Sequence, residues 1–279
     1  MMKERILIAG CGRLGTRLGV RLAAAGHHVF GLRRRCDALP SAITPCPADL
    51  ASTRDLSPGL PQRLDRIYFI MTPDQYDDAG YQAAYVTSLE HLLGALPDPH
   101  SHGARLVMVS STGVYGQDDG SWVDEASPTR PARFSGVRLL EAEALTRRHH
   151  GPSTVVRFGG IYGAGREALL RKVRRGDACQ ARPPRYTNRI HEDDCIGILE
   201  HLGELPAPPA VIIGVDDHPA TQCEVMTWLA EQLELPAPAH VSGDSAGRRC
   251  SNRLLRQSGY EPVYPDFRAG YSALLTASR

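Results

Sequence analysis

Residues 5–35 read RILIAGCGRLGTRLGVRLAAAGHHVFGLRRR, and this stretch decides the fold. The apolar run at residues 5–9 is typical of a buried strand. The next leucines, at positions 14, 18 and 22, recur at the spacing of one helix face. Gly26 ends that helix, and residues 28–32 predict a second strand. The stretch therefore predicts a strand, a glycine turn, a helix and another strand.

The turn GCGRLG at residues 10–15 matches the pattern G-x-G-x-x-G in the context that gives the pattern meaning. Gly10 permits a tight turn, Gly12 lets a pyrophosphate approach the backbone, and Gly15 lets the helix pack closely on the strand. The helix N-terminus offers N–H groups and a positive dipole end. We interpret the turn as a dinucleotide site formed by Gly10, Gly12, Arg13, Leu14 and Gly15. The alternative is a tight strand–helix turn without a ligand.

The end of the second strand indicates which dinucleotide is bound. NAD sites normally carry an Asp or Glu here for the ribose 2′-hydroxyl, but this sequence has Arg33 and Arg34. A guanidinium donates two hydrogen bonds to a phosphate, so the pattern favours NADP over NAD. A solvated basic turn is the alternative. After the weak strand candidate at residues 43–49, Asp49 and Leu50 are expected to flank the adenine.

Strands and helices continue to alternate up to residue 158. The predicted strands are residues 66–71, 105–109 and 154–158, and the predicted helices are residues 79–95 and 135–149, with a loop at 97–103. This alternation predicts an α/β fold with a Rossmann-type, doubly wound parallel sheet. After Gly159 the alternation loosens. We therefore expect an NADP-binding domain at residues 1–158 and a smaller substrate lobe at residues 159–279, interleaved with it.

Composition excludes several classes of protein. The net charge of +1 does not suit an electrostatic nucleic-acid binder. The N-terminus enters the first strand at once and no apolar run is long enough to span a membrane, so we expect a cytoplasmic protein without signal peptide or anchor.

The seven cysteines include no C-x-x-C pair, which predicts reduced thiols. His191 has no second His one helical turn later, and no metal site is predicted.

Four blocks together resemble the extended short-chain dehydrogenase/reductases, which include the nucleotide-sugar epimerases and dehydratases. They are the glycine turn, VSSTGVYG at 109–116, RFGGIYGAGR at 157–166 and NRIHEDD at 188–194. The resemblance covers nearly the whole chain. It implies a nicotinamide cofactor and a small-molecule substrate, such as a nucleotide sugar.

The resemblance also assigns roles to single residues. Ser111 corresponds to the catalytic Ser or Thr that hydrogen-bonds the substrate. The Tyr-x-x-x-Lys pair of the family is missing, because Phe134 stands at the Tyr position and Arg138 at the Lys position. No Tyr occurs between Tyr115 and Tyr162, so a shift in register does not restore the pair. This combination is similar to the atypical branch of the family, and Arg138 is expected to hold the nicotinamide ribose.

Other residues are candidates for the remaining roles. Tyr162 and His191 are candidate replacement acid/base groups, with a packing Tyr and a hydrogen-bonded hinge His as the alternatives. Thr112 and Tyr115 are expected to contact substrate, and Arg166 to clamp a phosphate or carboxylate. Further expected cofactor contacts are Thr72, Ser110 and Gly159.

Two functions remain open from the sequence. The first is an NADP-dependent oxidoreductase or epimerase-like enzyme with an altered acid/base group, which Ser111 and residues 159–166 favour. The second is a catalytically idle NADP(H)-binding sensor or partner protein, which Phe134 and Arg138 favour. Relatives pair through helices corresponding to residues 79–95 and 135–149, so a homodimer is also expected.

Overall fold

The computed structural model describes residues 3–52, 56 and 59–277. The chain forms two compact units. The first comprises Met1–Val114, Pro131–Arg157 and Ile196–Ile212, and the second comprises Tyr115–Arg130, Phe158–Cys195 and Ile213–Arg279.

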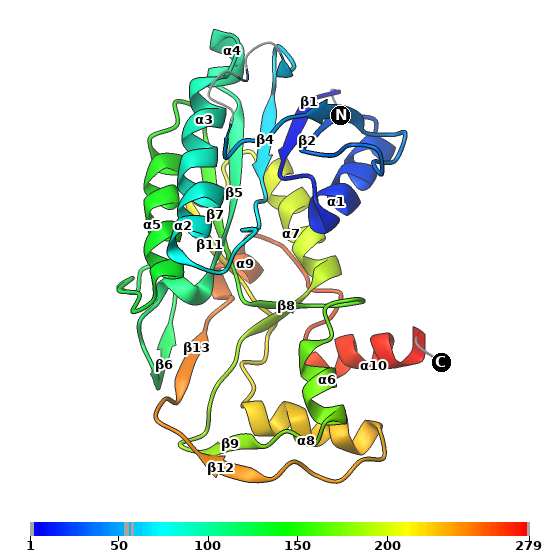
Figure 1. Cartoon of the computed structure of the whole chain (residues 1–279), viewed down its shortest axis with the longest axis vertical. Helices are drawn as coiled ribbons and strands as arrows, with labels where there is room; N and C mark the ends of the chain where they lie inside the picture. Colours follow the sequence, from blue (N-terminus) through cyan, green and yellow to red (C-terminus); the bar gives the residue numbers. More distant parts are fainter. Residues whose placement is uncertain (1–2, 53–55, 57–58, 278–279) are drawn as a thin grey trace. The chain divides into compact units, whose positions relative to one another are not determined.

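The sheet of the first unit is the centre of the fold. It has seven strands in the order β11-β7-β5-β4-β1-β2-β3 (Figure 1). The order runs outward from β1 in both directions, which makes a topological switch point between β1 and β4. The doubly wound parallel sheet is therefore confirmed. Its strands are β1 (Arg5–Ala9), β2 (His28–Arg33), β3 (Thr44–Pro47), β4 (Arg66–Phe69), β5 (Arg105–Ser111), β7 (Ser153–Phe158) and β11 (Val211–Gly214).

Helices cover both faces of this sheet (Figure 1). One face carries α2 (Asp78–Tyr81), η2 (Gln82–Thr87), α3 (Ser88–Gly94) and α5 (Phe134–Arg147), and the other carries α1 (Arg13–Ala24) and α7 (Glu192–Glu204). The helix predicted at 79–95 contains a π-helical segment, η2. The loop predicted at 97–103 instead contains α4 (Pro99–His102), because the Asp98 carboxylate caps it by accepting from the Ser101 amide at 2.9 Å.

Small residues bring α1 close to the sheet. Leu14, Leu18 and Leu22 are buried on the predicted face. A Cβ atom on Gly15 would lie 2.9 Å from the Cγ2 atom of Ile8, which leaves no room for a side chain. The close approach inferred from the third glycine of the motif is therefore present.

The second unit contains three two-stranded parallel sheets, β10–β8, β12–β9 and β13–β6. Its strands are β6 (Asp119–Val123), β8 (Gly160–Tyr162), β9 (Cys179–Arg182), β10 (Arg189–His191), β12 (His240–Ser242) and β13 (Gly247–Cys250). Its helices are α6 (Ala168–Arg174), α8 (Gln222–Gln232), α9 (Arg253–Gln257) and α10 (Phe267–Ala277). Buried side chains of α6, α8 and α10 share one apolar core.

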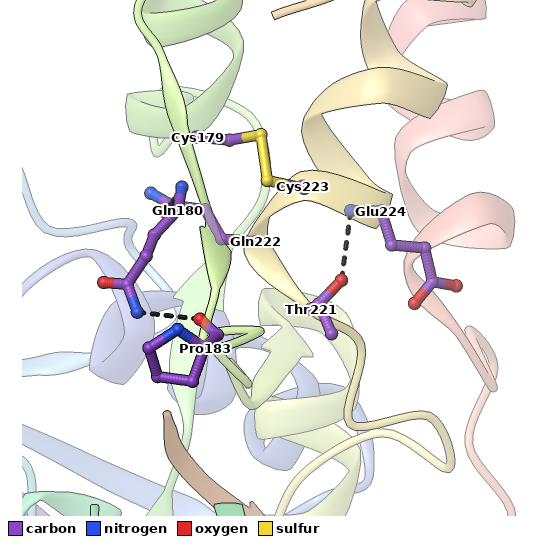
Figure 2. The surroundings of a disulfide bond; sticks show 7 residues. All are labelled: Cys179, Gln180, Pro183, Thr221, Gln222, Cys223 and Glu224. Carbon is purple, nitrogen blue, oxygen red and sulfur yellow. Dashed lines mark hydrogen bonds between the residues drawn. A yellow bond between two sulfur atoms is a disulfide. The ribbon is translucent and has the colours of Figure 1, made fainter. Parts of the chain in front are cut away.

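The prediction of reduced thiols is wrong for two of the seven cysteines. A disulfide joins Cys179 on β9 to Cys223 on α8, within the second unit (Figure 2). The two cysteines are 44 residues apart in the sequence, but packing brings their Cα atoms to 5.1 Å. Local spacing does not reveal such a pair, because disulfide formation depends on distance in the fold.

Among the described helices, none combines the length and the apolar character that a membrane crossing requires.

Candidate functional site

The β1–α1 turn leaves space where side chains would otherwise stand. Gly10 has φ +84°, and a Cβ there would clash with the Ile70 carbonyl oxygen and lie 2.8 Å from the Met71 sulfur. A Cβ on Gly12 would meet nothing nearer than 3.9 Å. Gly12 is the N-cap residue just before α1, and no side chain caps this helix. The positive end of α1 is therefore suited to an anion.

A pocket of about 600 Å³ opens beside this turn, within the first unit. Seven of the residues predicted to contact a cofactor line it: Gly10, Gly12, Arg33, Arg34, Asp49, Leu50 and Thr72. The volume, the absent side chains and the two arginines fit a nicotinamide dinucleotide. Predicted contacts outside the lining are Arg13, Leu14, Gly15, Ser110, Arg138 and Gly159.

The two arginines at the end of β2 make different contacts. Arg33 donates to the Cys11 carbonyl at 3.3 Å. Arg34 forms a two-pronged ion pair with Asp74, at 2.5 and 2.7 Å. These hydrogen bonds hold the pKa of Asp74 below its ordinary value. Asp74 also lines the pocket. Sequence reasoning missed it because it follows a different strand, 40 residues from Arg34.

Asp49 and Leu50 follow β3 at the pocket wall. The Asp49 carboxylate accepts from the Ala51 amide at 3.1 Å, which fixes the turn. Leu50 is buried, and its carbonyl contacts Nδ1 of His91 at 2.7 Å. This contact connects the pocket wall to α3, which carries His91.

The two serines that end β5 differ in their partners. The buried Ser110 hydroxyl donates to Glu143 at 2.8 Å, and Glu143 is fully buried in a two-pronged ion pair with Arg157. Ser111 Oγ accepts from the Gly113 amide at 3.1 Å. This is a local turn contact, which is the ordinary structural role of a Ser that ends a strand. The contact uses the oxygen only as an acceptor and leaves the hydroxyl proton for another acceptor. Thr112, next in the chain, begins η3 (Thr112–Val114) and is buried.

The start of α5 carries Phe134 and Arg138, the residues that the resemblance leads us to expect at the Tyr and Lys positions. Phe134 packs edge-on against Tyr76 and Tyr81, with ring centroids 6.0 and 5.5 Å away. Arg138 donates to both oxygens of Asp78 at 2.8 and 2.7 Å and to Glu141 at 2.9 Å. These carboxylates raise the pKa of Arg138 above its ordinary value. Both side chains therefore connect α5 to the segment around α2.

In the second unit, Tyr162 and His191 lie together. Their rings are 5.2 Å apart at 81°, and both residues are buried. Tyr162 also stacks on Tyr271 at 4.5 Å, and its hydroxyl contacts no hydrogen-bond partner among the described residues. Desolvation, with the nearby Asp216 carboxylate, raises the pKa of Tyr162. Nδ1 of His191 accepts from the Asp193 amide at 3.2 Å.

The buried carboxyl of Asp216 is a feature that sequence reasoning missed. Desolvation raises its pKa to about 8, against the lowering effect of the Arg189 charge. Its Oδ1 atom accepts from the His218 amide at 3.2 Å, and Oδ2 has no hydrogen-bond partner in the described part of the chain. The second unit therefore holds an acid that titrates near neutral pH.

The remaining predicted residues lie in the second unit. Gly159 packs against Val215, since a Cβ on Gly159 would lie 2.9 Å from a Val215 methyl carbon. Tyr115 is almost fully buried. The backbone amide of Arg166 donates to the Gly163 carbonyl at 2.9 Å, which closes a tight turn after β8.

Comparison with solved structures identifies the family. The chain matches a provisionally assigned NAD-dependent epimerase/dehydratase from Methylobacillus flagellatus with 35% identity and a TM-score of 0.80, over 100% of both chains. The chain belongs to the NAD-dependent epimerase/dehydratase family.

Other structures share the epimerase/dehydratase fold. A functionally unknown conserved protein from Silicibacter pomeroyi matches with 25% identity and a TM-score of 0.77, over 99% of both chains. The Bordetella bronchiseptica enzyme WbmG, solved with NAD, has 16% identity and a TM-score of 0.80, over 99% of this chain and 94% of WbmG. No protein-family model matches the chain. The search of curated proteins likewise found no match.

This epimerase/dehydratase family member thus combines a pocket suited to a nicotinamide dinucleotide with two side chains, Phe134 and Arg138, that are held in structural contacts. Phe134 has no proton to transfer. Arg138 stays protonated throughout the physiological range.

Proposed function

We propose that the chain is an NADP-dependent oxidoreductase of the epimerase/dehydratase type, acting on a sugar or nucleotide-sugar carbonyl or hydroxyl. The observation that carries the proposal is the pocket of about 600 Å³ beside the glycine turn, with Arg33 and Arg34 on its wall. The bound nicotinamide would supply hydride transfer. The substrate class is supported by MoeE5, solved with UDP-glucose and NAD, which matches with 22% identity and a TM-score of 0.75 over 96% of both chains.

The preference for NADP rests on the arginines. A 2′-phosphate would accept hydrogen bonds from Arg33 and would compete with Asp74 for Arg34. Replacing both arginines with Ala should weaken NADPH binding by several kcal/mol, since each charge-assisted hydrogen bond contributes about 1.5–3 kcal/mol. NADH binding should be little changed.

Asp74→Asn is the matched control, because it releases Arg34 without removing it. This variant should bind NADPH at least as tightly as the wild type in calorimetric titration. A wild-type protein that prefers NADH would overturn the assignment of NADP.

Ser111 is the catalytic residue in this proposal. Its hydroxyl keeps a proton to donate to a substrate oxygen while it accepts from the Gly113 amide. Ser111→Ala should lower turnover and leave NADPH affinity nearly unchanged. Equal turnover by Ser111→Ala and the wild type would contradict this role.

A second candidate function is an NADP(H)-binding protein without turnover. The contacts of Phe134 and Arg138 favour it, because neither side chain is left for acid/base chemistry at that position. A panel of sugars, aldehydes and ketones assayed with NADPH separates the two functions. Tight binding with no turnover on the whole panel would favour the second.

We also propose that two copies pair through the helical layer α2–α3 and α5. Val137 on α5 is 41% exposed and gives this layer an apolar contact. Sedimentation that shows only monomer at high micromolar concentration would contradict the proposal.

A further inference from the structure

The disulfide of the second unit has a histidine beside it. β12 pairs in parallel with β9, and His240 is the Cα partner of Cys179. One ligand atom each from Cys179, Cys223 and His240 lie within 4.8 Å of one another. The cluster therefore combines two sulfur atoms and an imidazole nitrogen from three different elements, β9, α8 and β12. Figure 2 shows the two cysteines.

We propose that Cys179, Cys223 and His240 bind a zinc-class metal ion when the disulfide is reduced. Two thiolates and one imidazole are ligands that Zn²⁺ prefers, and they leave a fourth position for water. Zinc–ligand distances of about 2.0–2.3 Å place tetrahedral ligand atoms roughly 3.3–3.8 Å apart. Once the sulfur–sulfur bond is broken, the two sulfurs would have to move apart, and the imidazole nitrogen, which lies within 4.8 Å of them, would have to complete the site.

Contacts other than the disulfide keep the three ligands together. The Cys179 amide donates to the Ala239 carbonyl at 2.8 Å, which ties β9 to the start of β12. The Gln180 amide donates to the Gln222 side chain at 3.1 Å, which ties β9 to α8. Cys179 is also part of the apolar core shared by α6, α8 and α10. We therefore expect the ligands to stay close after reduction.

The position of Cys223 suits a thiolate. Thr221 caps α8, because its hydroxyl accepts from the Glu224 amide at 3.2 Å. Cys223 follows as the second residue of an 11-residue helix. A helix N-terminus stabilises a thiolate, which is the form that binds metal. His240 is exposed, so a metal ion reaches the cluster from solvent.

The disulfide and the metal-bound form exclude each other, because both use the same two sulfur atoms. Their interconversion conserves atoms and electrons. A dithiol reductant passes two electrons and two protons to the disulfide and becomes a disulfide itself. The two new thiols and the neutral imidazole then bind Zn²⁺ and release two protons to solvent. A bound metal in turn protects the sulfurs from oxidation. Metal occupancy would thus depend on the thiol–disulfide balance of the surroundings.

The test uses the full chain and Co²⁺ as an optical probe for Zn²⁺. Thiol counting in denaturant should give five thiols before reduction and seven after it. The protein is reduced with dithiothreitol, freed of reductant under anaerobic conditions and titrated. We expect about one equivalent of Co²⁺ with a thiolate-to-cobalt absorption band in the reduced protein. We expect no such band in the oxidised protein, and displacement of the cobalt by Zn²⁺.

Variants locate the site. His240→Ala changes an exposed side chain and should weaken the cobalt affinity about tenfold or more while the disulfide still forms. Cys223→Ser should abolish the band. Cys36→Ser is the matched control, because Cys36 lies in the first unit and is a free thiol. A reduced protein without the band, an unchanged affinity in His240→Ala, or loss of the band in Cys36→Ser would each overturn the proposal.

Discussion

The nucleotide pocket and the first turn of α5 lie in the same unit but are built in opposite ways. At the β1–α1 turn the sequence omits side chains, so that Gly12 faces open space. At the start of α5 the sequence instead places two large side chains, Phe134 and Arg138, which contact Tyr81 and Asp78. The same unit therefore combines a turn that glycine leaves open with a helix start that side-chain contacts hold in place. The candidate acids of the second unit are likewise buried.

The largest expected effect concerns Asp216, the buried acid of the second unit. Its pKa of about 8 lies above the unfolded value near 4, so its contribution to stability is fully present below about pH 4. That contribution is lost as the pH rises through 8, at up to about 1.4 kcal/mol per pH unit. Asp216→Asn should therefore gain stability relative to the wild type between pH 5 and 8. Urea unfolding at several pH values measures the difference, and parallel pH profiles would contradict it.

The next prediction separates two glycines of the pocket. Gly10→Ala should destabilise the protein by at least about 2 kcal/mol, because Ala must adopt φ +84° and its Cβ meets the Ile70 carbonyl. Gly12→Ala should leave the melting temperature nearly unchanged and weaken NADPH binding about tenfold or more, since its Cβ enters space that a ligand needs. Unfolding and NADPH titration of both variants provide the measurement. Gly12→Ala with wild-type affinity would show that the open space at this turn is not used for binding.

A smaller effect tests whether Arg138 acts as a connection between helices. Arg138→Ala should leave NADPH affinity unchanged and speed hydrogen exchange at Asp78–Tyr81, because α2 loses its ion pair to α5. Exposed ion pairs contribute little to global stability, so the melting temperature should fall only slightly. A marked loss of NADPH affinity would instead favour the ribose-binding role expected from the family pattern.

The smallest effect is expected for Phe134→Tyr. A phenol with its ordinary pKa near 10 stays protonated at pH 7 and acts as an acid but poorly as a base. We expect a modest gain in carbonyl reduction and little gain in alcohol oxidation. Phe134→Leu is the control for altered packing against Tyr81. An equal gain in Leu and Tyr variants would exclude the phenol as its cause.

The sequence predicted the features that local patterns encode. Alternating elements and the glycine turn predicted the parallel sheet and the turn conformation at Gly10. Features that depend on distant pairings were missed. β6 was not predicted, because it pairs with β13, more than 120 residues later in the chain. The Arg34–Asp74 ion pair and the Cys179–Cys223 disulfide were missed for the same reason.

Burial also limited prediction at the candidate site. Tyr162 and His191 were recognised as candidate acid/base groups from their sequence blocks, but the raised pKa of Tyr162 depends on desolvation that no local pattern reports. Asp216 is the clearest case, because burial raises its pKa to about 8 even though the nearby Arg189 charge lowers it. Residue type alone predicts an ordinary carboxylate.

The path of the chain has a practical consequence for dissecting the protein. The backbone passes between the two units five times, after residues 114, 130, 157, 195 and 212. Neither unit can therefore be expressed as one continuous segment. A truncation after residue 157 would remove all of α7 and the whole edge strand β11, and with them residues 196–212 of the first unit. Circular permutation or split-chain complementation, rather than truncation, is the suitable way to study either unit alone.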